Sequence, residues 1–396
     1  MTTTLDRPEA KSLAINGGTP VSDQMIQVVS VRVEQEDIDA AVEVMQSGML
    51  AMGKHTAAFE ESFATRSDAT HAFACANGTC ALQLAYGALI EPGDEVLCPA
   101  WTYIATASML AAQNARIVWV DADPETYCIH IKDLEAKITP NTKAIACTHI
   151  YGNPVDINAI EALAKKHGLK VIYDAAQAHL ATYDGKGIGA FGDAVTYSFY
   201  PTKNMTTGEG GMVTVNDGAI AGRIKQLRSH GEVEKYVHAS IGFNYRMTDI
   251  EGAIGQRQLA RLPEATRQRR ANAKALDLLV DQINGLHAPT PTATAEHAYH
   301  LYAIRIDEDA FITPEQGTIR DAITAALRAE GVNFAIHYPM SLTHQPVFDV
   351  PGVAHQPVSD RLARTLFCVP VHQNLSQDDI TKVGEALAKV AAAYRA

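Results

Sequence analysis

The sequence predicts an α/β fold in which helices flank a mainly parallel sheet, with a smaller α+β unit at the C-terminal end. Short apolar runs alternate with stretches of helical periodicity between residues 71 and 174, and such alternation favours parallel strands joined by helices. The pattern changes after Gly242, where long helical stretches lead into a second set of strands and helices. A length of 396 residues leaves room for two or three domain-sized units.

Two amphipathic helices are expected before the first strand. The first covers residues 34–46 and spaces its apolar residues as one helix face does: Ile38, Ala41, Val42 and Met45. The second carries Ala58, Phe59 and Phe63 on one side. The residues before them have little periodicity and contain Gly17, Gly18 and Pro20, so we interpret residues 1–30 as an N-terminal arm.

Seven apolar runs are predicted to be buried strands. They cover residues 71–75, 95–99, 116–120, 143–150, 170–174, 194–199 and 211–215. Helices are predicted between several of them, over residues 80–90, 104–113 and 158–167. The stretch from Asp193 to Val215 departs from this alternation, because a glycine-rich loop joins its two strands without a helix.

The pattern of the chain changes beyond Gly242, and we place a domain boundary near residues 265–290. The new pattern indicates helices, then strands and helices in turn: helices over 248–262 and 264–283, a strand over 299–306, a helix over 318–330, a strand over 332–338 and a helix over 379–394. We therefore divide the chain into the arm (1–30), a large domain (31–270) and a small C-terminal domain (271–396).

Composition and charge exclude several classes of function. Lysine and arginine number 33 against 45 aspartate and glutamate residues, which gives a net charge of −12. Binding to nucleic acid or to an anionic membrane is not expected of so acidic a chain. Four arginines cluster in the predicted helices, and we interpret them as a solvated helix face or an interface: Arg261, Arg267, Arg269 and Arg270.

Cysteine use and the N-terminus favour a reduced, cytoplasmic protein. The six cysteines form no C-x-x-C pair, so neither a zinc ribbon nor a redox dithiol is indicated, and we expect buried thiols. The first residues lack the apolar core of a signal peptide. The longest uncharged stretch, residues 96–115, contains too many polar residues for a membrane span.

One glycine motif matches the dinucleotide fingerprint G-x-G-x-x-G, at Gly187 to Gly192. The fingerprint requires a strand before it and a helix after it, so that the helix N-terminus meets a pyrophosphate. Here the motif follows a turn-like segment and precedes a predicted strand. We interpret it as a turn between strands, and a nicotinamide oxidoreductase remains a minor alternative.

Three further features predict a site at the strand ends. Asn77, Gly78 and Thr79 lie between a strand and a helix, where free N–H groups favour a phosphate, although many such triplets are ordinary turns. Asp174 ends a strand and would either point into a ligand crevice or cap the next segment. Lys203 follows another strand in a polar, glycine-rich loop, where a desolvated amine can form a Schiff base.

Together these features fit pyridoxal 5′-phosphate (PLP). The cofactor needs a lysine for its aldehyde, an acid at its ring nitrogen and an anion site for its phosphate. Lys203 supplies the amine, Asp174 the acid and the 77–79 turn the anion site. The spacing from Asp174 to Lys203 leaves room for one turn and one strand, so the two residues can lie on neighbouring loops of one crevice.

With these residues in place, the chain resembles the DegT/DnrJ family of PLP-dependent sugar and cyclitol aminotransferases. The resemblance runs from AINGGTP near the start to the last helix, with the most specific matches in four segments: ANGTCALQLA (76–85), DEVLCPAWTYIATAS (94–108), YDAAQAHLATYDGKGIGAFGDAVTYSFYPTKNMTTGEGGMV (173–213) and GFNYRMTDIEGAIG (242–255). FAIHYPMSLTHQP (334–346) is a looser match. The resemblance implies fold-type I, a large PLP domain with a small C-terminal domain, and a homodimer with shared active sites.

The resemblance also implies a role for individual residues. Lys203 would form the internal aldimine and later act as general acid and base, and Asp174 would pair with the pyridinium nitrogen. The remaining cofactor contacts would come from six positions: Gln177 on the ring hydroxyl, Tyr103 stacked on the ring, Gly78, Thr79 and Ser198 on the phosphate, and Asn244 on the phosphate of the partner subunit. The roles of His179 and Trp101 stay open.

The resemblance implies a ping-pong aminotransferase that moves an amino group from glutamate, glutamine or a similar donor to a keto-sugar or keto-cyclitol. Alternatives within the family are a nucleotide-sugar acceptor, for which Arg246 and Lys54 could supply positive charge, a simple ketone acceptor, and a PLP-dependent dehydratase. The dehydratase branch has histidine at the lysine position, so Lys203 favours amino transfer. A PLP-binding regulator without turnover is a further alternative, but no basic patch or appended helix-turn-helix supports it.

Overall fold

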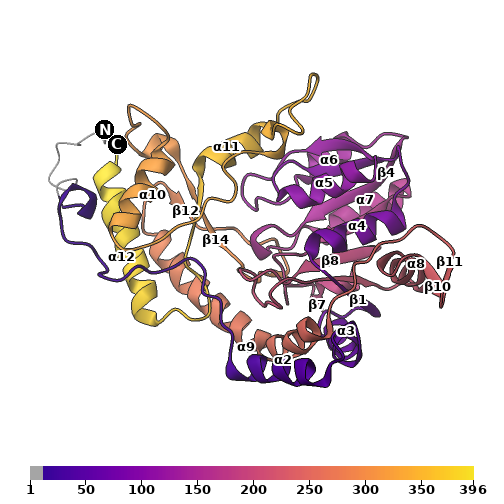
Figure 1. The fold of residues 1–396 in the computed structure, drawn as a ribbon. Coiled ribbons are helices and arrows are strands. Elements are labelled where there is room, and N and C mark those ends of the chain that lie inside the picture. Colours follow the sequence, from indigo (N-terminus) through magenta and orange to yellow (C-terminus); the bar gives the residue numbers. More distant parts are fainter. Residues whose placement is uncertain (1–11) are drawn as a thin grey trace.

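The computed structural model describes residues 12–396, and its larger part, on the right in Figure 1, is built on a seven-stranded sheet. The strand order is β1-β9-β8-β5-β4-β2-β3. The strands are β1 (His71–Cys75), β2 (Glu95–Pro99), β3 (Arg116–Val120), β4 (Thr142–Thr148), β5 (Lys170–Asp174), β8 (Ala194–Ser198) and β9 (Gly211–Val215). Five neighbouring strands, from β8 to β3, pair in parallel, and β9 is antiparallel to both of its neighbours. The predicted mainly parallel α/β sheet is therefore confirmed.

Helices cover both faces of the sheet. They are α3 (Lys54–Arg66), α4 (Gly78–Leu89), α5 (Ile104–Ala112), α6 (Ile131–Ala136), α7 (Ile157–His167) and α8 (Gly218–Arg228). Side chains of α4, α5 and α8 share one buried apolar cluster with the sheet, and side chains of α3, α6 and α7 share another. A sheet buried on both faces explains why its strands are almost continuously apolar.

The C-terminal part has an apolar cluster of its own. It packs residues of β14 (Tyr302–Ile306), β15 (Leu366–Val369), α10 (Ile319–Ala329) and α12 (Gln377–Tyr394) together with Leu13 and Ile26. Three antiparallel strands, β12 (Leu286–His287), β14 and β15, form its sheet. The proposed domain limit at residue 270 falls inside a helix and stays a prediction, and residues 1–11 of the predicted arm lie outside the described part of the chain.

One helix, α9 (Asp249–Val280), joins the two parts, and two separate helices had been predicted there. That prediction is wrong, because Pro263 lies inside α9 instead of ending it. A proline removes one backbone hydrogen bond and normally breaks a helix. Here Leu259 and Leu262 before it and Thr266 after it are all buried, so tertiary packing holds the helix together across the proline.

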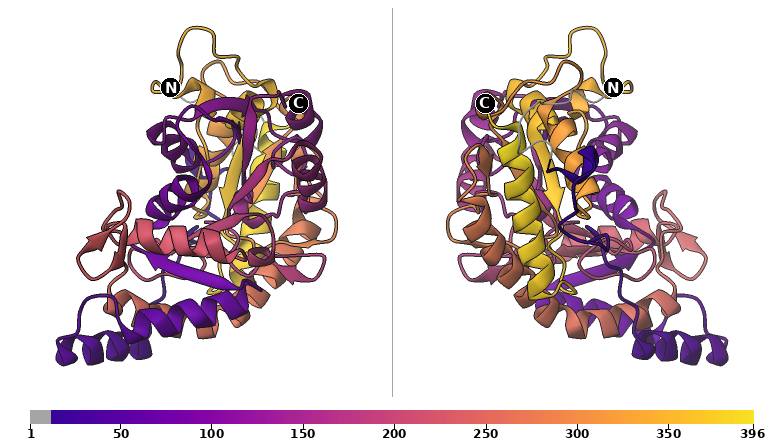
Figure 2. Two further views of the ribbon diagram at one scale, coloured as in Figure 1. Left: turned by 90° about the vertical axis from the view of Figure 1, so that its right-hand side faces the viewer. Right: turned by 90° about the vertical axis from the view of Figure 1, so that its left-hand side faces the viewer.

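Helix α2 (Gln35–Ser47) is confirmed, but it does not bury the apolar stripe seen in the sequence. Ile38, Val42 and Met45 are 47%, 43% and 61% exposed. The face that packs on α9 instead carries Asp37, Ala40 and Val44. Both views in Figure 2 show α2 beside α9 along the lower edge of the molecule.

The predicted strand at residues 332–338 is absent from the described structure. Only isolated bridges form there: Val332 pairs with Ile26, and Ala335 exchanges backbone hydrogen bonds of 3.0 and 2.8 Å with Cys368. The next residues, Ile336 to Tyr338, turn toward a cavity instead of extending the sheet. Helix α11 (Pro357–Thr365), strand β15, helix α6 and helix α8 had not been predicted.

The remaining elements are short. They are β6 (Thr182–Tyr183), β7 (Lys186–Gly187), β10 (Glu232–Glu234), β11 (Val237–His238), β13 (Ala295–Glu296) and the 3₁₀ helices η1 (Ala14–Asn16), η2 (Ile150–Gly152), η3 (Ile188–Ala190), η4 (Glu308–Ala310) and η5 (Leu342–His344). The Gly187–Gly192 motif joins β7 to β8 through η3, so the interpretation as a turn between strands is confirmed. None of the helices in residues 12–396 is both long and apolar enough to cross a bilayer.

Candidate active site

A cavity of about 960 Å³ opens where the parallel strands end. Residues at or just after the carboxyl ends of four of them line it: Thr102 after β2, Thr148 on β4, Asp174 on β5 and Ser198 on β8. Ligands of open α/β sheets bind at this edge. Seven of the eight predicted site residues lie on the cavity wall: Gly78, Thr79, Tyr103, Asp174, Gln177, Ser198 and Lys203.

Asp174 is buried at the end of β5 and is held by two hydrogen bonds. Its Oδ2 accepts from Thr106 Oγ1 at 2.7 Å, and its Oδ1 accepts from the Ala176 N–H at 3.0 Å. Burial raises the pKa of Asp174, although both hydrogen bonds and the nearby Lys203 act in the opposite direction. The alternative that Asp174 only caps the next segment is not supported, because its carboxylate also lines the cavity.

Thr106 is a site residue that the sequence analysis missed. Its hydroxyl lies 3.2 Å from the Thr102 hydroxyl, which in turn lies 2.8 Å from Thr148. Thr102 stands just before the N-cap of α5 and Thr106 lies in the first turn of that helix, so the entry into α5 brings the two hydroxyls together. That spacing was visible in WTYIAT, but nothing in the sequence showed that Asp174 lies opposite.

Lys203 lies in the loop after β8, where its N–H donates to the Tyr200 carbonyl at 2.9 Å. Its amine extends into the cavity and has no hydrogen-bond partner within residues 12–396. Burial lowers the pKa of Lys203 to about 8, while the charge of Asp174 acts to raise it. An amine with this pKa is partly neutral near physiological pH and can therefore act as a base or nucleophile.

The turn at residues 77–79 leaves backbone N–H groups open to the cavity. Asn77 caps α4: its Oδ1 accepts from the Cys80 N–H at 2.9 Å. Gly78 and Thr79 thus stand in the first turn, where backbone N–H groups have no partner within the helix. A Cβ on Gly78 would lie 2.7 Å from Ser198 Cβ, so only glycine allows α4 to begin this close to β8.

Gln177 is fixed from two sides. Its Oε1 accepts from the Tyr151 N–H at 2.6 Å, and its Nε2 donates to the Tyr338 hydroxyl at 3.1 Å. Tyr103 is 57% exposed on the same wall, with its ring 6.2 Å from that of Tyr338. Tyr338 belongs to the looser sequence match, and its distance from Gln177 along the chain concealed the contact.

Three histidines surround the amine, and burial keeps them neutral. Burial lowers the pKa of His179 to about 3, of His337 to about 4, and of His300 well below its usual value. His300 and His337 line the cavity, whereas His179 packs against the rings of Tyr197 and Phe199. Neither His300 nor His337 had been predicted: His300 lies outside the quoted matches, and His337 belongs to the looser match, where no role was assigned to it.

Trp101 supports the wall from behind. It is buried, and its Nε1 donates to the Tyr151 hydroxyl at 3.0 Å. Its ring meets that of Tyr338 edge to face at 5.9 Å. The Trp101 side chain is buried in the protein interior and does not line the cavity, so it shapes the site only through Tyr151 and Tyr338.

Asn244 is the predicted site residue that the structure does not bring to this cavity. It is exposed and pairs with Ser229 beside the hairpin of β10 and β11. Arg246 and Lys54, the candidates for binding a diphosphate, do not line the cavity of the described chain either.

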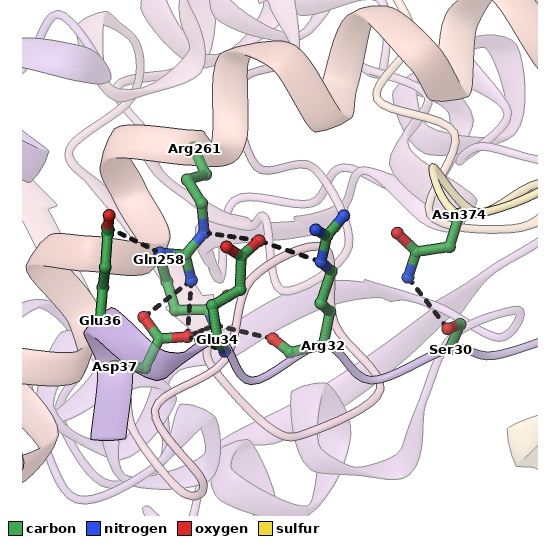
Figure 3. Close-up of polar contacts among 8 residues, drawn as sticks. All are labelled: Ser30, Arg32, Glu34, Glu36, Asp37, Gln258, Arg261 and Asn374. Atoms are coloured by element: carbon green, nitrogen blue, oxygen red, sulfur yellow. Dashed lines mark hydrogen bonds and ion pairs between the residues drawn. The ribbon is translucent and has the colours of Figure 1, made fainter. Parts of the chain in front are cut away.

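The arginine cluster is only partly the solvated face that had been expected. Arg269 contradicts that interpretation: it is buried and donates to the carbonyls of Tyr299 and His300. Arg261 binds the buried Asp37 of α2 with contacts of 2.6 and 2.7 Å (Figure 3). Arg261 also lines a cavity of about 470 Å³ that Lys203 shares. Arg267 is exposed and pairs with Glu264.

Comparisons with known proteins agree with this geometry. Residues 31–388 match the DegT/DnrJ/EryC1/StrS aminotransferase family. The chain is 37% identical to a pleiotropic regulatory protein of Geobacillus stearothermophilus, covering 88% of this chain and 92% of that protein. It is also 37% identical to GDP-perosamine synthase of Caulobacter vibrioides, covering 92% and 98%. A solved structure of S. venezuelae DesV in complex with a ketimine intermediate has a TM-score of 0.85 at 32% identity, covering 90% of this chain and 94% of that one.

Proposed function

The chain belongs to the DegT/DnrJ/EryC1/StrS aminotransferase family, and from this premise we propose that its cavity moves an amino group from glutamate, glutamine or a similar donor to the keto group of a sugar or cyclitol. Sugar aminotransferases are found among its relatives, which supports an acceptor of this kind. The observation that carries the proposal is the shared cavity of Lys203 and Asp174, with the open N-terminus of α4 on the same wall.

Family membership implies a PLP cofactor, and the cavity residues fit one. The phosphate would bind at the N–H groups of Gly78 and Thr79 and at the Ser198 hydroxyl, where the absence of a Cβ on Gly78 keeps the backbone close. Asp174 would face the ring nitrogen, Gln177 the ring hydroxyl and Tyr103 the ring face. When bound, PLP supplies an aldehyde that can carry the amino group and a ring that can accept an electron pair.

We assign Lys203 to the covalent attachment of the cofactor's aldehyde and to the proton transfers. Its lowered pKa supports both, since a neutral amine is needed to attack a carbonyl carbon and to remove a proton. In the first half-reaction the donor amine would displace Lys203 from the aldehyde carbon, and the freed Nζ would move a proton from the donor Cα to that carbon. The donor would leave as a keto acid, with its nitrogen left in the site and its new oxygen supplied by water. In the second half-reaction Nζ would return a proton to the former carbonyl carbon of the acceptor. A positioned acid and base of this kind contributes about 10²–10⁴-fold in rate.

Asp174 would act by staying charged next to a protonated ring nitrogen. In the cofactor-free chain its burial raises its pKa, so a buried carboxylate there is costly without a cationic partner. A ring N–H⁺ would supply that partner, and the hydrogen bond from Thr106 would hold the carboxylate in line. Asp174 would thereby keep the nitrogen protonated, as electron withdrawal by the ring requires.

We further propose a homodimer in which each subunit completes the site of the other. Asn244 supports this, because it is exposed away from its own cavity and would be free to reach the phosphate bound by a partner subunit. Apolar side chains exposed on α2 and on the segment just before it offer a surface for the contact: Val29, Val31, Val33, Ile38, Val42 and Met45. All six cysteines are free thiols, five of them buried, which supports a reducing, cytoplasmic compartment.

The replacement Lys203→Ala tests the assignment. Turnover is expected to be lost together with the visible absorbance of the bound cofactor that borohydride bleaches in the parent protein. Lys186→Ala, which removes an exposed lysine on β7, serves as the matched control and should leave both unchanged. Catalytic transamination by Lys203→Ala with the parent's absorbance would overturn the proposal.

The acceptor class can be separated from the regulator alternative in one experiment. A relative named as a regulatory protein favours that alternative, whereas an amine facing Asp174 favours turnover. The protein would be loaded with pyridoxamine phosphate and offered keto-cyclitols, nucleotide keto-sugars and plain ketones. Return of the aldehyde form with one class identifies the acceptor, and no return with any class supports a regulator without turnover.

A further inference from the structure

Outside the cavity, three metal-binding side chains converge on the segment that leads from η5 into α11. We propose that His344, His355 and Asp360 form a binding site for a divalent transition-metal ion, Zn²⁺ foremost. One ligand atom of each residue lies within 4.8 Å of the other two. His344 ends η5, His355 precedes α11 and Asp360 stands in the first half of α11.

The donor set suits zinc. Two imidazole nitrogens and one carboxylate oxygen, with water in the fourth position, make a common four-coordinate zinc site. Metal–ligand bonds near 2.0–2.1 Å place neighbouring ligands of a tetrahedral ion about 3.3 Å apart. His344 Nε2 and Asp360 Oδ2 are 3.2 Å apart, so this pair already spans one edge of the tetrahedron. Among divalent ions, nitrogen donors of this kind also favour Cu²⁺, Ni²⁺ and Co²⁺ over Mg²⁺ and Ca²⁺.

Two of the three ligands stand on anchored backbone. The Ser341 hydroxyl donates to Asp360 Oδ1 at 2.6 Å, which leaves Oδ2 directed at His344 and acts as the second-layer contact that metal-bound carboxylates usually have. The start of η5 is fixed by the Leu342 N–H, which donates to the Ala100 carbonyl at 2.9 Å.

Helix α11, which carries Asp360, is also anchored to the rest of the protein. The Asp121 carboxylate accepts from the N–H groups of Val358 and Ser359 at 2.9 and 2.8 Å, which ties the first turn of α11 to the end of β3. Asp360 therefore does not depend on a mobile loop for its position.

His355 is the ligand that would have to move. Its ring stacks on that of His344 at 4.0 Å with an angle of 2° between the planes. Nitrogen lone pairs of two parallel rings do not converge, so one ring must turn to share an ion. Both rings are exposed, and His355 makes no hydrogen bond within residues 12–396, so little opposes the turn.

A bound ion would join the two ends of the loop at residues 345–354. Phe348 of that loop packs edge to face on Trp119 at 5.1 Å, and Tyr338, shortly before the loop, holds Gln177 in the cavity. The ion would therefore clamp a segment that continues into the cavity wall. It would take no part in amino transfer, so the metal site does not depend on the proposed function.

Cobalt titration of the full-length protein, first freed of metal with a chelator, tests the site. Co²⁺ in a site of low coordination number with nitrogen and oxygen ligands has visible d–d bands that are much more intense than those of the hexaaqua ion. We expect one equivalent of Co²⁺ per chain to develop such bands and one equivalent of Zn²⁺ to abolish them. Binding should weaken at least ten-fold in His344→Ala and in His355→Ala, and by about ten-fold in Ser341→Ala, the range typical of second-layer contacts.

The matched control is His167→Ala, which removes an exposed histidine at the end of α7 and should bind cobalt as the parent does. Asp360 also bonds Ser341, so its replacement could disturb folding. His355→Ala removes no hydrogen bond and therefore decides the matter, with its far-UV spectrum as the folding check. Absence of d–d bands in the parent, or bands that survive in both His344→Ala and His355→Ala, would overturn the proposal.

Discussion

Burial raises the pKa of Asp174 and lowers the pKa of Lys203, so these two residues, which line one cavity close enough for their charges to interact, are each driven toward the neutral form. Their mutual attraction opposes both shifts, because each charge stabilises the other. The cavity thus holds an amine that is easily deprotonated beside an acid that needs a cation. This is the pairing of titratable groups expected of a site that moves protons.

The first prediction concerns the ionisation of Lys203. The pKa of Lys203 is lowered to about 8, so in the cofactor-free protein its amine should react with an aryl-fluoride reagent at a rate that rises with pH and levels off above about pH 8. An ordinary lysine should still be gaining reactivity there, because its pKa is about 10.4. Peptide mapping of the labelled protein at several pH values measures the labelling rate of Lys203 and that of the exposed Lys186, the internal reference, in one sample.

Asp174→Asn sharpens this test. Since the charge of Asp174 raises the pKa of Lys203, its removal should shift the reactivity curve of Lys203 to lower pH. The curve of Lys186 should not move. A shift of the Lys203 curve to higher pH, or Lys203 and Lys186 curves that coincide, would show that burial does not set the ionisation of this amine.

The second prediction concerns the close approach of α4 to β8. In Gly78→Ala the new Cβ would lie 2.7 Å from Ser198 Cβ, so α4 must move away from the strand end. We expect the protein to lose about 1–3 kcal/mol of stability, as overpacked sites do, and to bind PLP at least ten-fold more weakly. Denaturant unfolding and a fluorescence titration with PLP measure the two effects.

Gly218→Ala is the control for that change. Gly218 also stands at the first position of a helix, α8, but nothing lies within 4 Å of the position its Cβ would take. Its replacement should leave PLP binding unchanged. The double change Gly78→Ala with Ser198→Gly should restore part of the lost stability, and equal losses at positions 78 and 218 would argue against a steric cause.

How much the sequence could predict depended on the range of the interactions involved. Strands such as β2 and β5 were predicted with their observed bounds, because burial on both faces makes a strand a short apolar run. Asp174 and Lys203 could be selected because Asp174 ends such a run and Lys203 lies in the loop after one. Contacts between distant segments, such as Thr106 with Asp174 or Tyr338 with Gln177, left no local signal.

The errors have the same origin. Pro263 predicted a break in α9 because the packing of Leu259 and Thr266 on either side could not be read from the sequence. The exposed apolar stripe of α2 looked like a face that packs on the core. Periodicity shows that a helix has an apolar face, but it does not show which other surface, if any, packs on that face. The residue that α2 does bury, Asp37, is charged, and its partner lies 224 positions away.

The last prediction concerns that partner. Asp37 is fully buried and receives two contacts from Arg261 and one, at 2.9 Å, from Gln258 (Figure 3). Arg261→Ala would leave this carboxylate buried without a cation, and breaking a buried pair in this way costs about 3–5 kcal/mol. Because the Arg261 side chain is 29% exposed, water can partly replace it, so we expect a loss near the lower end of that range.

Arg267→Ala, which removes an exposed arginine of the same helix from an exposed pair with Glu264, should cost less than about 1 kcal/mol. Urea unfolding of the three proteins measures the difference, and equal stabilities of Arg261→Ala and Arg267→Ala would show that the Asp37 contact does not hold α2 on α9.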